Sequence, residues 1–123
     1  MRAIVVDDSR AMRLILRKHL TSVGFDVIEA GHGREALAAL QGRNDIDLAL
    51  VDINMPEMGG VELVAALRGQ VQYADMRVLM VSSEQDLDTM ARALEAGAND
   101  YLMKPFTPDG LMSKLELLGM AKG

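Results

Sequence analysis

The sequence predicts an α/β fold in which helices cover both faces of a five-stranded parallel sheet. Short apolar segments alternate five times with segments whose apolar residues have helical spacing. The connections between them are short, as expected for consecutive β–α units. The chain has 123 residues, 50% of them hydrophobic, which suits one domain with its own core. We therefore expect a single domain over residues 1–123. For its sheet we assume the strand order 2-1-3-4-5, one of the common orders of such folds.

Five apolar segments are expected to form the strands. The first, Ala3–Val6, is rich in β-branched residues and ends at a pair of aspartates. The others are expected at Val27–Ile28, Leu48–Ile53, Val78–Val81 and Tyr101–Met103. Apart from Asp52 in the third, these segments are uncharged, which is typical of strands that are buried on both faces of a sheet.

Five segments with helical spacing follow these strands. Ser9 can cap the first helix, whose apolar residues lie three or four positions apart up to Leu20, and Gly24 ends it. The later helices are expected over Arg34–Leu40, Val61–Leu67, Leu87–Leu94 and from Pro108 to about Leu118. Thr107 precedes Pro108, a favourable pair of cap and first helical residue.

Charge and composition exclude several functional classes. The formal net charge is -5 and aromatic residues make up 3% of the chain. Binding to nucleic acid is therefore not expected, because phosphate groups need an excess of Lys and Arg. The sequence has no cysteine, so disulfides and thiol nucleophiles are excluded. No apolar run approaches the roughly 20 residues of a membrane-spanning helix, and we expect a monomeric protein of the cytoplasm without a membrane partner.

Acidic residues follow two of the predicted strands at the same edge of the sheet. Asp7 and Asp8 follow the first strand, and Asp52 lies in the last part of the third. In sheets of this order, ligands generally bind at the carboxyl ends of strands one and three, where the strand order reverses. Three carboxylates in one crevice repel one another, and Mg²⁺ relieves the repulsion while leaving positions for water and phosphate oxygens. The sequence therefore predicts a magnesium site that a phosphoryl group completes.

The other strand ends at this edge supply a hydroxyl group and a cation. Ser82 follows the fourth predicted strand and Lys104 follows the fifth. A carboxylate nucleophile, a metal, a hydroxyl donor and a lysine are the parts needed for phosphoryl transfer to an aspartate, with Asp52 as the attacking group. Each feature alone is a weak signal, since an acidic pair after a strand often only places charge at the start of a helix. Their combination at four strand ends favours a functional site.

The sequence resembles the receiver domains of two-component response regulators, above all the free-standing chemotaxis type. The resemblance extends over essentially the whole chain and is carried by four segments: Val5–Ser9, Val51–Pro56, Val81–Ser83 and Ala96–Phe106. It implies a flavodoxin-like fold and a switch that a histidine kinase or a phosphotransfer domain phosphorylates. A protein of this kind acts on a downstream protein, such as a flagellar motor switch, and is not an enzyme with an external substrate.

The resemblance implies a role for each acidic residue. Asp52 is the expected phosphoacceptor. Mg²⁺ is expected to bind the side chains of Asp8 and Asp52 and the backbone carbonyl of Asn54. Asp7 is expected to act mainly through a bound water.

The resemblance also implies how the phosphoryl group is recognised. Ser82 is expected to hydrogen-bond it, and Lys104 to pair with one of its oxygens after a cis Lys104–Pro105 bond. Tyr101 matches the aromatic residue that turns inward when the hydroxyl group moves toward the phosphoryl group. Asn54 and Glu84 match positions that flank the phosphoryl group, where we expect them to influence the access of water.

A partner surface is expected around the fifth strand. Tyr101 and Met103 point to the same face because side chains alternate along a strand. By the resemblance, this face joins the fourth and fifth helices, so Met90 and Lys114 are included. Simple partial burial of the two methionines is the alternative. The segment Gln85–Asp88 lacks the lysines of enteric chemotaxis regulators, which puts an identical contact with a motor switch in doubt.

Other interpretations remain open from the sequence. Arg10, Arg13 and Arg17 form a basic stripe on the first helix, expected to be a solvated face, with kinase docking as the alternative. The domain could be a phosphorelay receiver or regulate an enzyme in trans. A small aspartate-nucleophile phosphohydrolase is less favoured, because Asn54 stands where that class needs a second Asp. A flavin module is disfavoured, because Asp7 and Asp8 would repel the cofactor's phosphate.

Overall fold

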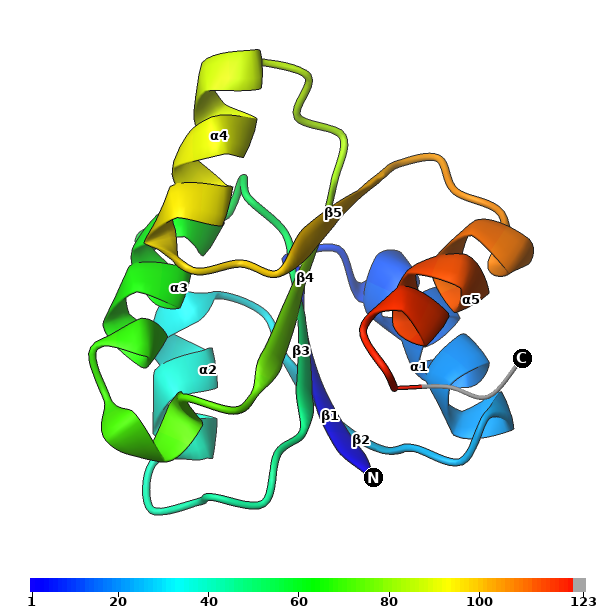
Figure 1. Cartoon of the computed structure of the whole chain (residues 1–123), viewed down its shortest axis with the longest axis horizontal. Helices are drawn as coiled ribbons and strands as arrows, with labels where there is room; N and C mark the ends of the chain where they lie inside the picture. The colour runs from blue at the N-terminus through cyan, green and yellow to red at the C-terminus, as the bar shows by residue number, and fades with distance from the viewer. Residues whose placement is uncertain (121–123) are drawn as a thin grey trace.

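The computed structural model describes residues 1–120, which contain a five-stranded parallel sheet between two layers of helices (Figure 1). The strands are β1 (Arg2–Val6), β2 (Asp26–Ala30), β3 (Leu48–Val51), β4 (Arg77–Ser82) and β5 (Asp100–Met103). Their order is β2-β1-β3-β4-β5, and all neighbouring pairs are parallel. The predicted sheet and its strand order are confirmed.

The helices lie on both faces of the sheet, as the alternation of segments predicts. They are α1 (Arg10–Ser22), α2 (Gly33–Leu40), α3 (Gly60–Arg68), α4 (Leu87–Ala96) and α5 (Pro108–Leu117), with a 3₁₀ turn η1 (Val71–Tyr73) before β4. Figure 1 shows α1 and α5 on one side of the sheet and α2, α3 and α4 on the other. Among the described residues, no helix combines the length and the hydrophobicity needed to cross a membrane.

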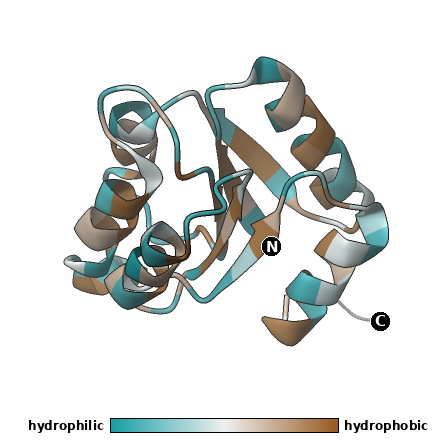
Figure 2. Ribbon diagram, turned by 90° about the horizontal axis from the view of Figure 1, so that it is seen from above, coloured by the Kyte–Doolittle hydropathy of each residue, from teal (hydrophilic) through white to brown (hydrophobic). Residues whose placement is uncertain are grey.

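Two hydrophobic cores fill the space between the sheet and its helices. Alternate residues of each strand point to opposite faces, so Ile4 and Val6 of β1 join the core under α2, α3 and α4. Ala3 and Val5 join the core under α1 and α5. Figure 2 shows the resulting concentration of hydrophobic residues along the strands between the helices. Burial on both faces explains why these strands lack the polar alternation of half-exposed strands.

Helix caps fix where three of the helices begin. The Ser9 side chain accepts a hydrogen bond from the Met12 amide at 3.2 Å, and Thr107 accepts one from Gly110 at 2.9 Å. Both caps were predicted, because a hydroxyl group satisfies an amide that has no partner within the helix. His32, which the sequence did not assign to a site, caps α2 through Nδ1, which accepts from the Glu35 amide at 3.2 Å.

The third strand ends earlier than predicted, and this places Asp52 in the loop beyond the sheet. The sequence predicts a strand up to Ile53, whereas β3 ends at Val51. The chain bends because α3 begins directly against this loop, where the Gly60 amide donates to the Ile53 carbonyl at 2.8 Å. A Cβ atom at Gly60 would lie 2.1 Å from the Asp52 carbonyl oxygen. A glycine is therefore required for this close approach.

Candidate metal and phosphoryl site

Three carboxylates meet at the carboxyl ends of β1 and β3. The two strands pair in parallel with Val6 opposite Val51, so the residues that follow them, Asp7 and Asp52, lie side by side. With Asp8, they bring one carboxylate oxygen each within 4.8 Å of one another. Asp7 and Asp52 are buried, while Asp8 is exposed. The clustering predicted from the strand order is therefore present in the structure.

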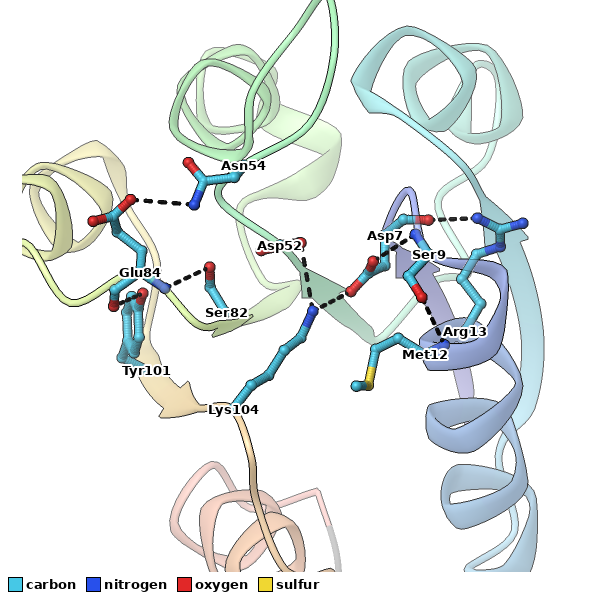
Figure 3. A network of polar contacts seen from close by, with 10 residues as sticks. All are labelled: Asp7, Ser9, Met12, Arg13, Asp52, Asn54, Ser82, Glu84, Tyr101 and Lys104. Atoms are coloured by element: carbon cyan, nitrogen blue, oxygen red, sulfur yellow. Dashed lines mark hydrogen bonds and ion pairs between the residues drawn. The ribbon is translucent and has the colours of Figure 1, made fainter.

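Lys104 lies among these carboxylates, as the sequence predicts for the residue after β5. Its Nζ is 2.6 Å from Asp7 Oδ2 and 3.4 Å from Asp52 Oδ2, and its side chain is 15% exposed. Figure 3 shows Lys104 reaching between the two carboxylates. The Lys104–Pro105 peptide bond is cis, as the resemblance implies. A single cation thus partly offsets the repulsion within the cluster.

Every polar atom of Asp7 has a partner. Its amide donates to the Ala30 carbonyl at 3.1 Å, and its Oδ1 accepts from the Ser9 amide at 2.8 Å. Lys104 holds Oδ2, and Arg13 Nη1 donates to the backbone carbonyl oxygen at 2.5 Å. The sequence did not indicate this last contact, because no pattern of residue types shows which backbone oxygen a long side chain will reach.

The predicted basic stripe of α1 is only partly a solvated face. Arg10 is exposed, but Arg13 and Arg17 bind the two oxygens of the Glu29 carboxylate on β2, at 3.2 Å and 2.8 Å. The hydrogen bond from Arg17, and to a smaller extent the one from Arg13, holds the pKa of Glu29 below its usual value. The two arginines therefore connect α1 to the sheet.

Ser82 and Tyr101 are joined through the backbone of Glu84. Ser82 is fully buried at the end of β4, and its Oγ accepts from the Glu84 amide at 3.2 Å. The Tyr101 hydroxyl donates to the Glu84 carbonyl at 3.0 Å, and burial raises the pKa of that hydroxyl. In Figure 3 these groups lie in line beside Asp52. The resemblance implied a pair of switch residues, and the structure shows the residue that links them.

Asn54 and Glu84 bridge the rim of the site. Asn54 Nδ2 donates to Glu84 Oε2 at 3.1 Å. A hydrogen bond from the Asp86 amide, together with that from Asn54, lowers the pKa of Glu84. Both residues also line a cavity of about 390 Å³, together with Thr89 and Arg92 of α4. In Figure 3 the two side chains lie to one side of Asp52, and their influence on the access of water stays a prediction.

The residues of the expected partner surface lie on three elements: Met90 on α4, Tyr101 and Met103 on β5, and Lys114 on α5. Tyr101 is buried and Met90 and Met103 are half-buried against the core under α2, α3 and α4. Lys114 of α5 binds the carboxylate of Asp100, the first residue of β5, at 3.0 Å. Both methionines are thus partly buried, as the alternative to a partner surface expects. They also keep exposed atoms that a partner could contact.

Comparison with known proteins identifies the family. A family model for the response regulator receiver domain matches residues 3–116. The chain is 46% identical over 125 residues to the chemotaxis protein CheY homolog of Campylobacter jejuni, with 100% of this chain and 96% of the relative covered. It is 40% identical over 119 residues to the chemotaxis protein CheY1 of Helicobacter pylori, with 96% of each covered. A solved structure of CheY4 from Vibrio cholerae has a TM-score of 0.88 and 36% identity, covering 95% of this chain and 97% of that one.

The chain therefore belongs to the response regulator receiver domain family. It is a component of two-component signal transduction, and its relatives are signalling proteins rather than classical enzymes. The family suggested by the four sequence segments is confirmed, and so is the fold.

Proposed function

We propose that this chain is a phosphorylation-driven switch in chemotaxis, with Asp52 as the phosphoacceptor and Mg²⁺ as the cofactor. The observation that carries the proposal is the cluster of Asp7, Asp8 and Asp52 with Lys104 inserted between two of its carboxylates. The similarity to chemotaxis proteins of Campylobacter jejuni and Helicobacter pylori supports a role in chemotaxis. The proposed domain is residues 1–123.

The donor groups at the site fit Mg²⁺. All are oxygens, and Mg²⁺ prefers one or two carboxylates together with water and phosphate oxygens. Asp8 and Asp52 would hold the ion with the backbone carbonyl of Asn54, and Asp7 would act through a water. Bound Mg²⁺ would neutralise charge on the phosphoryl oxygens.

In the proposed reaction, a carboxylate oxygen of Asp52 attacks the phosphorus of a phosphohistidine. An O–P bond forms, the P–N bond breaks, and its electron pair stays on the imidazole nitrogen. Lys104 Nζ lies 3.4 Å from Asp52, close enough to pair with the new phosphoryl oxygens. The donor is a histidine kinase or a phosphotransfer domain.

The proposed switch starts from the charge that the phosphoryl group adds. Ser82 moves to donate a hydrogen bond to it, and this changes the contact of Ser82 Oγ with the Glu84 amide. Because the Glu84 carbonyl holds the Tyr101 hydroxyl, the change reaches β5. The surface of Met90, Tyr101, Met103 and Lys114 then alters its affinity for a downstream protein, such as a flagellar motor switch.

Mass spectrometry of the intact protein tests the phosphoacceptor. After incubation with a small acyl phosphate, we expect one phosphoryl adduct with Mg²⁺ and none with EDTA. Asp52→Asn keeps the shape of the side chain and should abolish the adduct. Asp26→Asn removes an exposed carboxylate at the opposite end of the sheet and should leave the adduct unchanged. An adduct on Asp52→Asn would show that another residue is the acceptor.

A further inference from the structure

We propose that Arg13 is a positioning residue that sets the Mg²⁺ affinity of the acidic cluster. It fixes the peptide group that joins Asp7 to Asp8. The inference rests on the proposed function, because it concerns the ion that we propose for this site.

The key contact is between a side chain of α1 and the backbone of the metal-binding loop. Arg13 Nη1 donates to the Asp7 carbonyl oxygen at 2.5 Å, as Figure 3 shows. That oxygen belongs to the Asp7–Asp8 peptide group, which is planar. Holding the oxygen therefore also fixes the direction in which the chain enters Asp8.

Asp8 needs this external support more than its neighbour does. Within residues 1–120, the Asp8 carboxylate has no hydrogen-bond or ion-pair partner, and it is exposed. Asp7, in contrast, is held by Ser9 and Lys104 through its own side chain. The backbone is thus the main element that keeps Asp8 aimed at the site.

Arg13 can carry out this role because its guanidinium group is itself fixed. Its Nε donates to Glu29 Oε1 at 3.2 Å, and Arg17 holds the other oxygen of the same carboxylate. The Arg13 side chain is 18% exposed. A planar guanidinium group can serve both acceptors at once, which an ammonium group on a lysine cannot do as well.

Two effects of Arg13 on Mg²⁺ have opposite signs. Its positive charge repels the ion, whereas its hydrogen bond orients a ligand of the ion. Glu29 lies against the guanidinium group and offsets the charge, so we expect the orienting effect to be larger. Residues that orient metal ligands typically change affinity by about 10- to 100-fold when replaced.

Isothermal titration of the full chain with MgCl₂ separates these effects. For Arg13→Gln we expect about tenfold weaker Mg²⁺ binding than for the wild type. The matched control is Arg17→Gln, which loses an arginine from the same Glu29 carboxylate but none from Asp7, and its affinity should fall much less than that of Arg13→Gln. Arg13→Lys keeps the charge without the planar group and should lie between the wild type and Arg13→Gln.

The outcomes are distinct. Tighter binding by Arg13→Gln would show that charge repulsion dominates and would overturn the inference, as would equal losses in Arg13→Gln and Arg17→Gln. Unchanged affinity in Arg13→Gln would also overturn it while leaving the proposed function intact. Absence of Mg²⁺ binding by the wild type would overturn the metal site and this inference together. Circular dichroism would show whether Arg13→Gln is folded. A second variant, Glu29→Gln, loosens Arg13 indirectly and should give a smaller loss of Mg²⁺ affinity.

Discussion

At the scale of single residues, Glu84 connects Ser82 and Tyr101, the two groups of the proposed switch, through its backbone rather than its side chain. Its amide donates to Ser82 and its carbonyl accepts from Tyr101. Both bonds are independent of the side chain at position 84, which is free to bind Asn54. If Ser82 and Tyr101 act as proposed, Glu84 links them through its backbone while its side chain stays bound to Asn54.

The protonation of Tyr101 is expected to make stability depend on alkaline pH. Burial raises its pKa above the usual value of 10.0, so the folded protein holds the phenolic proton more tightly than the unfolded chain does. The resulting stabilisation is complete below the unfolded pKa and is lost as pH rises through the folded pKa. Urea unfolding at a series of alkaline pH values should therefore show the wild type losing stability relative to Tyr101→Phe.

Tyr73→Phe is the control for this experiment, since the chain has two tyrosines and this variant retains Tyr101. It should still lose stability at alkaline pH relative to the double variant Tyr73→Phe/Tyr101→Phe. A constant difference between the wild type and Tyr101→Phe from about pH 9 to about pH 11 would contradict the assignment.

The residues of the site that the sequence predicts lie at or just beyond the carboxyl end of a strand. Asp7, Asp52, Ser82 and Lys104 lie together because parallel strands end at one edge. Arg13 is different: it lies within a helix, and its partner is a backbone oxygen. The spacing of side chains in a sequence carries no information about such an acceptor, so this contact required the structure.

At the scale of elements, the start of α3 determines where Asp52 lies. The helix begins so close to the end of β3 that a Cβ atom at Gly60 would be 2.1 Å from the Asp52 carbonyl oxygen and 2.8 Å from Ile53 Cα. The position of Asp52 therefore depends on residue 60 having no side chain.

Two substitutions in α3 test this dependence. Gly60→Ala should destabilise the fold by about 3 kcal/mol, because the backbone must move to relieve the clash. Gly69→Ala at the other end of α3 is the control: its φ is -74°, and a Cβ atom there would lie at an ordinary 3.5 Å from the Ala66 carbonyl oxygen. We expect it to be neutral or slightly stabilising, by up to about 1 kcal/mol. Equal effects in urea unfolding would show that the close approach does not matter.

The order and type of the elements could be predicted from the sequence, since alternating apolar periods and turn residues are local signals. The exact residues at which the elements begin and end could be predicted less accurately. The end of β3 depends on packing against α3, and η1 depends on the burial of Tyr73, whose hydroxyl donates to the Leu40 carbonyl at 2.6 Å. Both features come from contacts between distant parts of the chain.

At the scale of the whole molecule, the Lys104–Asp7 ion pair connects the ends of β5 and β1. Two strands, β3 and β4, lie between them in the sheet. The Asp7 side chain is 2% exposed, so the charge that the lysine pairs with has little access to water. This pair should therefore matter to stability far more than a surface ion pair does.

Lys104→Ala should lower the free energy of unfolding by about 3 kcal/mol without Mg²⁺, because it leaves a buried carboxylate without its cation. Added Mg²⁺ should restore part of the loss by binding the folded state. The control is Lys114→Ala, which breaks a more exposed pair with Asp100 and should cost at most about 1 kcal/mol. Similar losses for both variants in urea unfolding would show that the Lys104 pair has no special role.

The same ion pair has a consequence for the order in which the site is made during synthesis. Asp7 and Lys104 are 97 positions apart, so the ribosome makes the carboxylate long before the cation. A nascent chain that stops short of residue 104 has Asp7 and Asp52 but lacks the lysine that pairs with both. The cluster therefore gains its cation only in chains whose last strand has been translated and has joined the sheet.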